Sequence, residues 1–184
     1  MRVISGTARG TRLKTPEGLL TRPTTDRVKE AIFSIIQFEV EGSRFLDLFG
    51  GSGQMGIEAL SRGAASAVIV DGRREACRLI QDNLRLTRLA PKAKVVQSDY
   101  LAYLDRCRET FDLIFLDPPY AEVFLENALK KISEIDILSS RCIIICERPA
   151  DKLLEFEIPG LTRGKDYRYG KTWVTIFRKA DEEL

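Results

Sequence analysis

Short β-rich runs alternate with stretches of helical periodicity along most of the chain, and this alternation restricts the possible folds more than any other feature. The β-rich runs are residues 44–49, 67–70, 94–97, 111–116 and 141–146. Strands that recur with a helix between each pair form βαβ units, which build a mostly parallel sheet with helices on both faces. The sequence therefore predicts a doubly wound α/β fold.

Both ends of the chain depart from this alternation. Residues 1–14 are typical of a small hairpin around residues 6–10, and Thr24 and Thr25 can cap a helix that starts near Pro23. Residues 172–177 are β-rich with no helix before them, which indicates an antiparallel pair at the sheet edge. At 184 residues, we expect a single domain over 1–184, with 1–40 as a hairpin and helix extension.

Composition excludes several kinds of chemistry. The chain has no histidine and four cysteines without a Cys-x-x-Cys pair, so neither a zinc site nor a histidine-activated nucleophile is expected. No metal site is predicted. The longest apolar run has five residues, 142–146, far below the roughly 20 that cross a bilayer. We expect a cytoplasmic protein with no membrane partner.

The charges are unevenly distributed, although 29 basic and 27 acidic residues leave a net charge of only +2. Residues 1–16 contain four basic residues and no acidic one, and residues 161–179 contain six basic residues and one acidic residue. If the two ends meet in space, they form one positive face of the kind that attracts phosphate backbones. Two separate solvated surfaces are an equally good interpretation.

A glycine-rich loop follows the first predicted strand. Gly51, Gly53 and Gly56 satisfy the pattern G-x-G-x-x-G, and Asp71 ends the second strand about 20 residues later, where a ribose-binding acid belongs. Glycines allow a nucleotide to approach the backbone closely. A side chain at Gly53 is therefore expected to block the ligand.

Two further carboxylates belong to this region. Asp47 lies just before the glycines, where it would repel a pyrophosphate and attract an ammonium group. S-adenosylmethionine carries an α-ammonium and no phosphate, so Asp47 favours it over NAD. Asp99 follows the third strand, where it can either accept a hydrogen bond from an adenine amino group or cap a helix.

The fourth strand ends in Asp117, Pro118, Pro119 and Tyr120. The prolines force extended backbone and remove both N–H donors, so carbonyl oxygens, a carboxylate and an aromatic ring remain. Asp117 and the Pro118 carbonyl can accept two N–H bonds from an exocyclic amine while Tyr120 stacks on the base. Two acceptors favour pyramidalisation of the amine, which frees its lone pair to attack a methyl group.

These motifs resemble those of a known family. Residues 47–53 look like motif I and residues 117–120 like motif IV of the S-adenosylmethionine-dependent amino-methyltransferases. Residues 4–10, 22–31 and 56–64 narrow the resemblance to the RsmD family, which methylates the 2-amino group of a guanine in bacterial 16S rRNA. The resemblance implies a Rossmann-like methyltransferase fold with a mostly parallel, seven-stranded sheet and an antiparallel C-terminal edge.

The resemblance also implies roles for individual residues. Arg22 and Thr24 would approach the methionine carboxylate, Asp71 the ribose hydroxyls and Asp99 the adenine, while Asp117 and Tyr120 would bind the target base. The chain departs from the family at Asp71, where glutamate is more usual, and at residues 54–55, with no clear consequence. The implied partner is 16S rRNA or an assembly intermediate of the small ribosomal subunit, bound by a monomer.

Three other functions stay open at this point. An adenine amino-methyltransferase of DNA or RNA would use the same Asp-Pro-Pro-Tyr tetrapeptide, although the chain lacks room for a separate target-recognition domain. An NAD-dependent oxidoreductase would use the same glycine loop. A binding module could keep the cofactor fold without activity, but the intact tetrapeptide argues against this.

Overall fold

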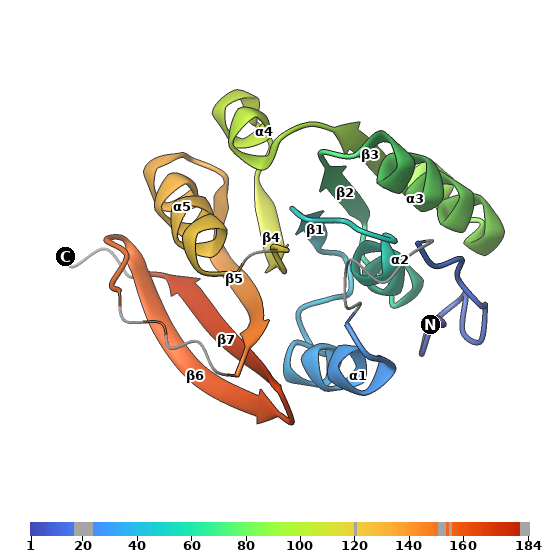
Figure 1. Cartoon of the computed structure of the whole chain (residues 1–184), viewed down its shortest axis with the longest axis horizontal. Coiled ribbons are helices and arrows are strands. Elements are labelled where there is room, and N and C mark those ends of the chain that lie inside the picture. The colour runs from blue at the N-terminus through green and yellow to red at the C-terminus, as the bar shows by residue number, and fades with distance from the viewer. Residues whose placement is uncertain (17–23, 120, 151–153, 155, 181–184) are drawn as a thin grey trace.

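The computed structural model describes residues 1–16, 24–119, 121–150, 154 and 156–180. Within them lies a seven-stranded sheet with the order β3-β2-β1-β4-β5-β7-β6 (Figure 1). The strands are β1 (Arg44–Asp47), β2 (Ser66–Asp71), β3 (Ala93–Gln97), β4 (Phe111–Leu116), β5 (Leu138–Pro149), β6 (Leu161–Tyr169) and β7 (Thr172–Lys179). The helices are α1 (Asp26–Ile35), α2 (Gln54–Ser61), α3 (Arg74–Thr87), α4 (Tyr100–Arg106) and α5 (Ala121–Glu134).

Strands β1 to β5 run parallel, and β7 pairs antiparallel with both β5 and β6. This confirms the predicted fold class. The chain moves from β1 outward through β2 to β3, and then crosses back so that β4 pairs with the other side of β1. Ligands of doubly wound sheets bind at the carboxyl ends of the strands where the order reverses. That point lies between β1 and β4.

Helices cover the sheet on both faces, as predicted. Helices α1, α2 and α3 pack on one face through Phe33, Ile57 and Ile80, and α4 and α5 pack on the other through Leu104 and Leu129. Successive strand residues point to opposite faces, so each parallel strand contributes to both hydrophobic clusters. Burying each large aliphatic or aromatic side chain stabilises the fold by roughly 1.5–3 kcal/mol.

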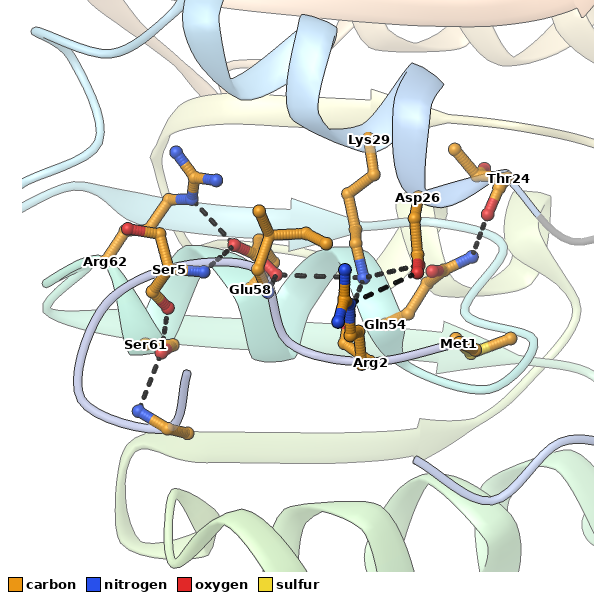
Figure 2. Close-up of polar contacts among 12 residues, drawn as sticks. Met1, Arg2, Ser5, Thr24, Asp26, Lys29, Gln54, Glu58, Ser61 and Arg62 are labelled. Atoms are coloured by element: carbon orange, nitrogen blue, oxygen red, sulfur yellow. Dashed lines mark hydrogen bonds and ion pairs between the residues drawn. The ribbon is translucent and has the colours of Figure 1, made fainter. Parts of the chain in front are cut away.

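The N-terminal hairpin is a pair of strands too short to form a ladder. A single antiparallel bridge joins Arg2 to Arg12, and a turn between them includes Gly6 and Gly10. The hairpin docks on α2: Glu58 accepts the backbone N–H groups of Ile4 (2.8 Å) and Ser5 (3.0 Å) (Figure 2). The hairpin is therefore held in place by its backbone.

An ion pair buried at this junction ties α1 to α2. The Lys29 ammonium lies 3.7 Å from the Glu58 carboxylate, with both side chains fully buried, and it donates to the Arg2 carbonyl at 2.5 Å (Figure 2). Burial lowers the pKa of Lys29, and the charges of Glu58 and Asp26 oppose that shift. Breaking one partner of such a pair leaves an uncompensated buried charge.

The start of α1 differs in detail from the prediction. Thr25 is the N-cap, and its hydroxyl accepts the N–H of Val28. The side chain of Thr24 instead donates to Glu147 at 2.6 Å. Pro23 lies outside the described residues.

The two strands at the C-terminal edge confirm the predicted antiparallel closure, but β6 has no clear sequence signal. Exposed residues with a glycine among them occupy 162–165, and the pairing of β6 with β7 shifts register between Arg163 and Asp166. That irregularity breaks the alternation of polar and apolar residues by which a strand is recognised.

The basic ends of the chain do not meet. Figure 1 shows the N-terminal hairpin beside α2 and α3, on the opposite side of the molecule from β6. The single positive face considered from the sequence is therefore wrong, and the two basic segments form separate surfaces. In the described part of the chain, no helix has both the length and the apolar character needed to span a bilayer.

Candidate functional site

A pocket of about 620 Å³ opens at the carboxyl ends of the parallel strands, across the point where the strand order reverses. This volume is typical of small-molecule and cofactor sites. Its walls come from the loops after β1, β2, β3 and β4, the end of β5 and the turn between β6 and β7. Described site residues predicted from the sequence that line it are Thr24, Asp47, Gly51, Asp71, Asp99, Asp117, Pro118 and Pro119.

The glycine loop forms the floor of this pocket. Gly51 and Gly53 have φ values of +57° and +79°, which favour glycine. A Cβ atom at Gly51 would meet nothing within 4 Å, whereas one at Gly53 would lie 3.0 Å from Cγ2 of Ile80. A side chain at Gly53 would therefore first contact α3, and its effect on the ligand stays a prediction.

Gly56 has a packing role of its own. A Cβ atom there would lie 2.7 Å from Cδ1 of Ile69. The missing side chain lets α2 pack closely on β2, which positions the first turn of α2 under the pocket. This is the role that helix-to-strand packing gives to the third glycine of the pattern.

Asp71 ties the glycine loop to the end of β2. Its Oδ2 accepts the N–H of Gly51 at 2.9 Å, and its Oδ1 accepts the N–H (2.9 Å) and Nε (3.2 Å) of Arg73. Each carboxylate oxygen accepts more than one hydrogen bond. Nη2 of Arg73 also donates to Oδ2, at 3.4 Å, so each oxygen already accepts two bonds. A ligand hydroxyl would replace this longest bond while the bond to Gly51 keeps the loop in place.

Asp99 is the N-cap of α4. Its Oδ1 accepts the N–H groups of Leu101 (2.9 Å) and Ala102 (3.1 Å). Of the two roles considered from the sequence, the structure contains the cap, while Asp99 also lines the pocket. A role toward an adenine amino group stays a prediction.

Three aromatic rings form the apolar wall beside Asp99. Phe49 lies 5.1 Å from Tyr100, and Tyr100 lies 5.5 Å from Phe124, measured between ring centroids. All three line the pocket. Such a wall suits the face of a planar heterocycle.

Asp47 is the carboxylate most clearly in need of a ligand. It is almost fully buried, and burial, reinforced by the charge of Asp71, raises its pKa to about 7, although N–H groups of Gly56 and Phe49 favour the ionised form. Its Oδ1 has no hydrogen-bond partner among the described residues. A buried polar atom without a partner costs free energy, and a cationic ligand group would remove that cost.

Asp117 and Pro118 lie where the sequence places them, at the end of β4 in the pocket. Burial and the charges of Glu147 and Asp47 raise the pKa of Asp117, while a hydrogen bond from Thr24 opposes the shift. The ionised form of Asp117 is therefore costly in the free protein, and N–H groups of a ligand would stabilise it. The predicted residues Tyr120 and Arg22 lie outside the described residues.

The sequence analysis missed one residue of the site, Glu147, and gave no role to another, Gln54, which it noted only as a departure from the family. Glu147 ends the central part of β5 and is buried, and the amide of Gln54 donates to the carbonyl of Thr24 at 2.9 Å (Figure 2). Glu147 could have been identified from the sequence, since carboxylates also stand at the ends of β1, β2 and β4. The role of Gln54 could not have been identified in this way, because only the fold brings the Thr24 carbonyl to its side chain. The described residues contain no group of His, Cys, Asp and Glu side chains arranged to hold a metal ion.

Comparison with known proteins places this geometry in a family. The family described as "Conserved hypothetical protein 95" matches residues 1–178. The chain is 42% identical over 182 residues to "Putative rRNA methyltransferase YlbH" of Bacillus subtilis (strain 168), covering 97% of this chain and 99% of that protein. It is 34% identical over 147 residues to "Ribosomal RNA small subunit methyltransferase D" of Escherichia coli (strain K12), covering 80% of this chain and 74% of that protein.

A solved structure agrees with these relatives. "Putative methyltransferase yhhF from Escherichia coli" superposes with a TM-score of 0.89 at 27% identity, over 99% of both chains. The match covers the hairpin, the sheet and the antiparallel edge together. The chain belongs to the RsmD family.

Proposed function

We propose that this protein is an rRNA methyltransferase that transfers a methyl group from S-adenosylmethionine to the exocyclic 2-amino group of a guanine in 16S rRNA. One observation carries the proposal: Asp47 and Asp117, at the ends of neighbouring strands, face one pocket whose floor is a glycine loop. Asp47 suits the ammonium group of the cofactor, and Asp117 suits the amine of a base. The relatives are named as methyltransferases of ribosomal RNA.

The residues present fit S-adenosylmethionine. The unpartnered Oδ1 of Asp47 would accept its α-ammonium group, and Asp71 would accept its ribose hydroxyls. Gly51 lines the pocket and lets the backbone approach the ligand, and the aromatic wall of Phe49, Tyr100 and Phe124 would pack on the adenine beside Asp99. By resemblance to the family, Arg22 and Thr24 would approach the carboxylate. The bound cofactor supplies an electrophilic methyl group on a sulfonium.

The chain's own groups prepare the amine for attack. Asp117 and the Pro118 carbonyl would accept its two N–H bonds, Pro119 would keep the backbone extended, and Tyr120 would stack on the base. An amine conjugated with a purine is a poor nucleophile. Acceptors aimed at both hydrogens favour the pyramidal geometry in which the lone pair can reach the methyl carbon.

The pocket disfavours the oxidoreductase alternative. A pyrophosphate on the glycine loop would lie near Asp47, whose carboxylate is buried and without a cation among the described residues. Two like charges at such a site repel strongly. An adenine amino-methyltransferase would use the same acceptors, so only the product distinguishes it.

The test identifies the methylated nucleoside. The protein is incubated with radiolabelled S-adenosylmethionine and undermethylated 16S rRNA, either naked or in small subunits, and the RNA is digested to nucleosides. We expect label in N2-methylguanosine at one position. Label in N6-methyladenosine would overturn the assignment of guanine as the target base. Calorimetry that detects binding of NAD but not of S-adenosylmethionine would overturn the assignment of the cofactor.

A variant links the product to the site. Asp117→Ala removes a charge-assisted acceptor, which should cost about 3–4 kcal/mol in the transition state, or 10²–10³-fold in rate. Cofactor affinity should stay nearly unchanged. Asp112→Asn is the control, since Asp112 lies on the same strand but pairs with Arg44 on the surface.

A further inference from the structure

Three carboxylates form a row across neighbouring strands at the pocket. In the parallel pairing of β4 with β5, Leu116 lies beside Cys146, so the next residues along, Asp117 and Glu147, are also neighbours. Side chains alternate between sheet faces, and Leu116 and Cys146 both belong to the cluster on the α4 and α5 face. Asp117 and Glu147 therefore point to the opposite face, as does Asp47, whose neighbour Leu46 also belongs to that cluster.

The Thr24 hydroxyl joins two members of this row. It donates to Oε2 of Glu147 at 2.6 Å, and a hydrogen bond from Thr24 also lowers the pKa of Asp117, against the effect of burial. Both Thr24 and Glu147 are buried, at 5% and 8% exposure. Gln54 fixes this arrangement from α2, because its side-chain amide donates to the Thr24 carbonyl (Figure 2). A hydroxyl that both donates and accepts can pass a proton between the two carboxylates.

The proposed reaction creates a proton that must leave the pocket. The amine lone pair forms the new N–C bond, the S–C bond breaks, and its electron pair stays on sulfur to give a neutral thioether. The amine nitrogen then carries a positive charge and one proton too many. Asp117 holds an N–H of this amine, so it is the first acceptor.

We propose that Glu147 is a positioning residue that takes up this proton through the Thr24 hydroxyl after methyl transfer. The inference rests on the proposed function, since it needs an amine as the acceptor of the methyl group. Proton transfer from Asp117 to Thr24 and from Thr24 to Glu147 returns Asp117 to its carboxylate form. The second negative charge also stabilises the positive charge that develops on the amine.

Other charged groups face two of these carboxylates, Asp117 and Glu147, and influence the pH at which they exchange protons. Asp47 faces them from β1, with Asp71 of β2 behind, and Lys171 and Arg73 line the same pocket from the β6–β7 turn and the loop after β2. Arg148 is Glu147's neighbour along β5, but its guanidinium lies 3.8 Å from Asp166 and over the Trp173 ring. The Glu147 charge raises the pKa of Asp117.

The experiment compares single-turnover methylation of rRNA by wild type and Glu147→Gln across pH, at saturating S-adenosylmethionine. We expect the plateau rate to fall at least ten-fold. We also expect the acidic limb of the profile to move to lower pH, because loss of the Glu147 charge lowers the pKa of Asp117. The control Glu157→Gln, at an exposed position, should match wild type in both respects.

A second pair of variants separates the relay from folding. At saturating S-adenosylmethionine, Thr24→Val keeps the shape without the hydroxyl and should lose rate as Glu147→Gln does. Thr24→Ser restores the hydroxyl and should recover most of the rate that Thr24→Val loses. A Glu147→Gln plateau equal to wild type, or equal rates for the two Thr24 variants, would overturn the inference. If wild type itself fails to methylate guanine, the proposed function has failed instead, and the two failures are distinguishable.

Discussion

Asn83 connects the glycine loop to the N-terminal hairpin through one buried side chain. Its amide nitrogen donates to the carbonyl of Ser52 (2.9 Å) and of Lys14 (3.0 Å), and its Oδ1 accepts the N–H of Lys14 (2.8 Å). The Ser52 hydroxyl also contacts the Met1 sulfur at 3.2 Å. A segment at the start of the chain thus helps to hold the loop that forms the pocket floor.

Replacing Asn83 with alanine should therefore destabilise the protein and loosen the pocket. Three backbone groups lose a partner, and an unsatisfied buried group costs roughly 1–3 kcal/mol. We expect the free energy of unfolding in urea to fall by at least that amount, and calorimetry to show weaker S-adenosylmethionine binding. Asp82→Asn is the matched control, because among the described residues the ion pairs of Asp82 are with the exposed side chains of Lys14 and Arg85. Equal stability of the two variants would contradict this role.

Cofactor affinity should depend on pH through Asp47. Burial raises the pKa of its carboxyl to about 7, and an ammonium ligand favours the ionised form. Binding must then release a proton at pH values below about 7, so affinity should rise by about ten-fold between pH 5.5 and 7. Calorimetry in buffers of different ionisation enthalpy measures that proton. Asp47→Asn should weaken binding and abolish this dependence, and an unchanged dependence would assign the proton elsewhere.

The same shift has a consequence for the free protein. The folded-state pKa of Asp47 lies above the ordinary carboxyl value of 3.8, so the folded state binds more protons than the unfolded state between these two pH values. Its contribution to stability is therefore full at low pH and is lost as the pH rises toward 7. A bound ammonium group would offset this loss.

Substitutions at Gly56 and Gly53 should both act on stability before they act on cofactor binding. Gly56→Ala places a Cβ 2.7 Å from Ile69, and overpacking of this kind costs about 1–3 kcal/mol, so we expect a lower melting temperature. Gly53→Val should also act on stability first, through its positive φ and its contact with Ile80. Thermal unfolding with and without S-adenosylmethionine measures both effects. A Gly53→Val protein with wild-type stability that fails to bind S-adenosylmethionine would show that the side chain blocks the ligand directly.

The fold and the chemical residues of the pocket were predictable for a common reason. Parallel strands buried on both faces are continuous apolar runs, such as residues 113–116 and 143–145, and turns at their carboxyl ends collect at one edge. Asp47, Asp71 and Asp117 end or follow apolar runs directly, and Asp99 comes two residues after β3. The position of each carboxylate therefore follows from strand order alone.

Contacts between distant segments were not predictable in this way. Thr24 shows no sign in the sequence that its hydroxyl meets Glu147, 123 residues away, and its neighbour Thr25 takes the cap that both were expected to share. Lys29 falls among polar positions of α1, yet it is fully buried because Glu58 and the Arg2 carbonyl meet it there. Such pairs depend on the tertiary packing of helices against the hairpin, which no local pattern encodes.

Because the basic ends lie apart, we expect RNA phosphates to contact two separate surfaces of the protein. Arg9 and Arg12 are exposed on the hairpin, while Lys14 pairs with Asp82 at 2.9 Å. Arg168 and Lys171 lie on the other side, where Lys171 lines the pocket. A guanine in structured RNA must leave its stack at a cost of a few kcal/mol. Phosphate contacts on both sides of the pocket would offset this cost.

Replacing Arg9, Arg12 and Lys14 with alanine should therefore weaken rRNA binding and flatten its salt dependence, by up to about 0.7–0.9 in log–log slope for each lost phosphate contact. Most of the change should come from the arginines, since Lys14 already has a carboxylate partner. S-adenosylmethionine affinity should not change, because the hairpin is attached to Glu58 and Asn83 through backbone groups that alanine keeps. Filter binding at several salt concentrations gives the slope. A triple variant that methylates rRNA as efficiently as wild type at physiological salt would leave recognition to the surface around Arg168 and Lys171.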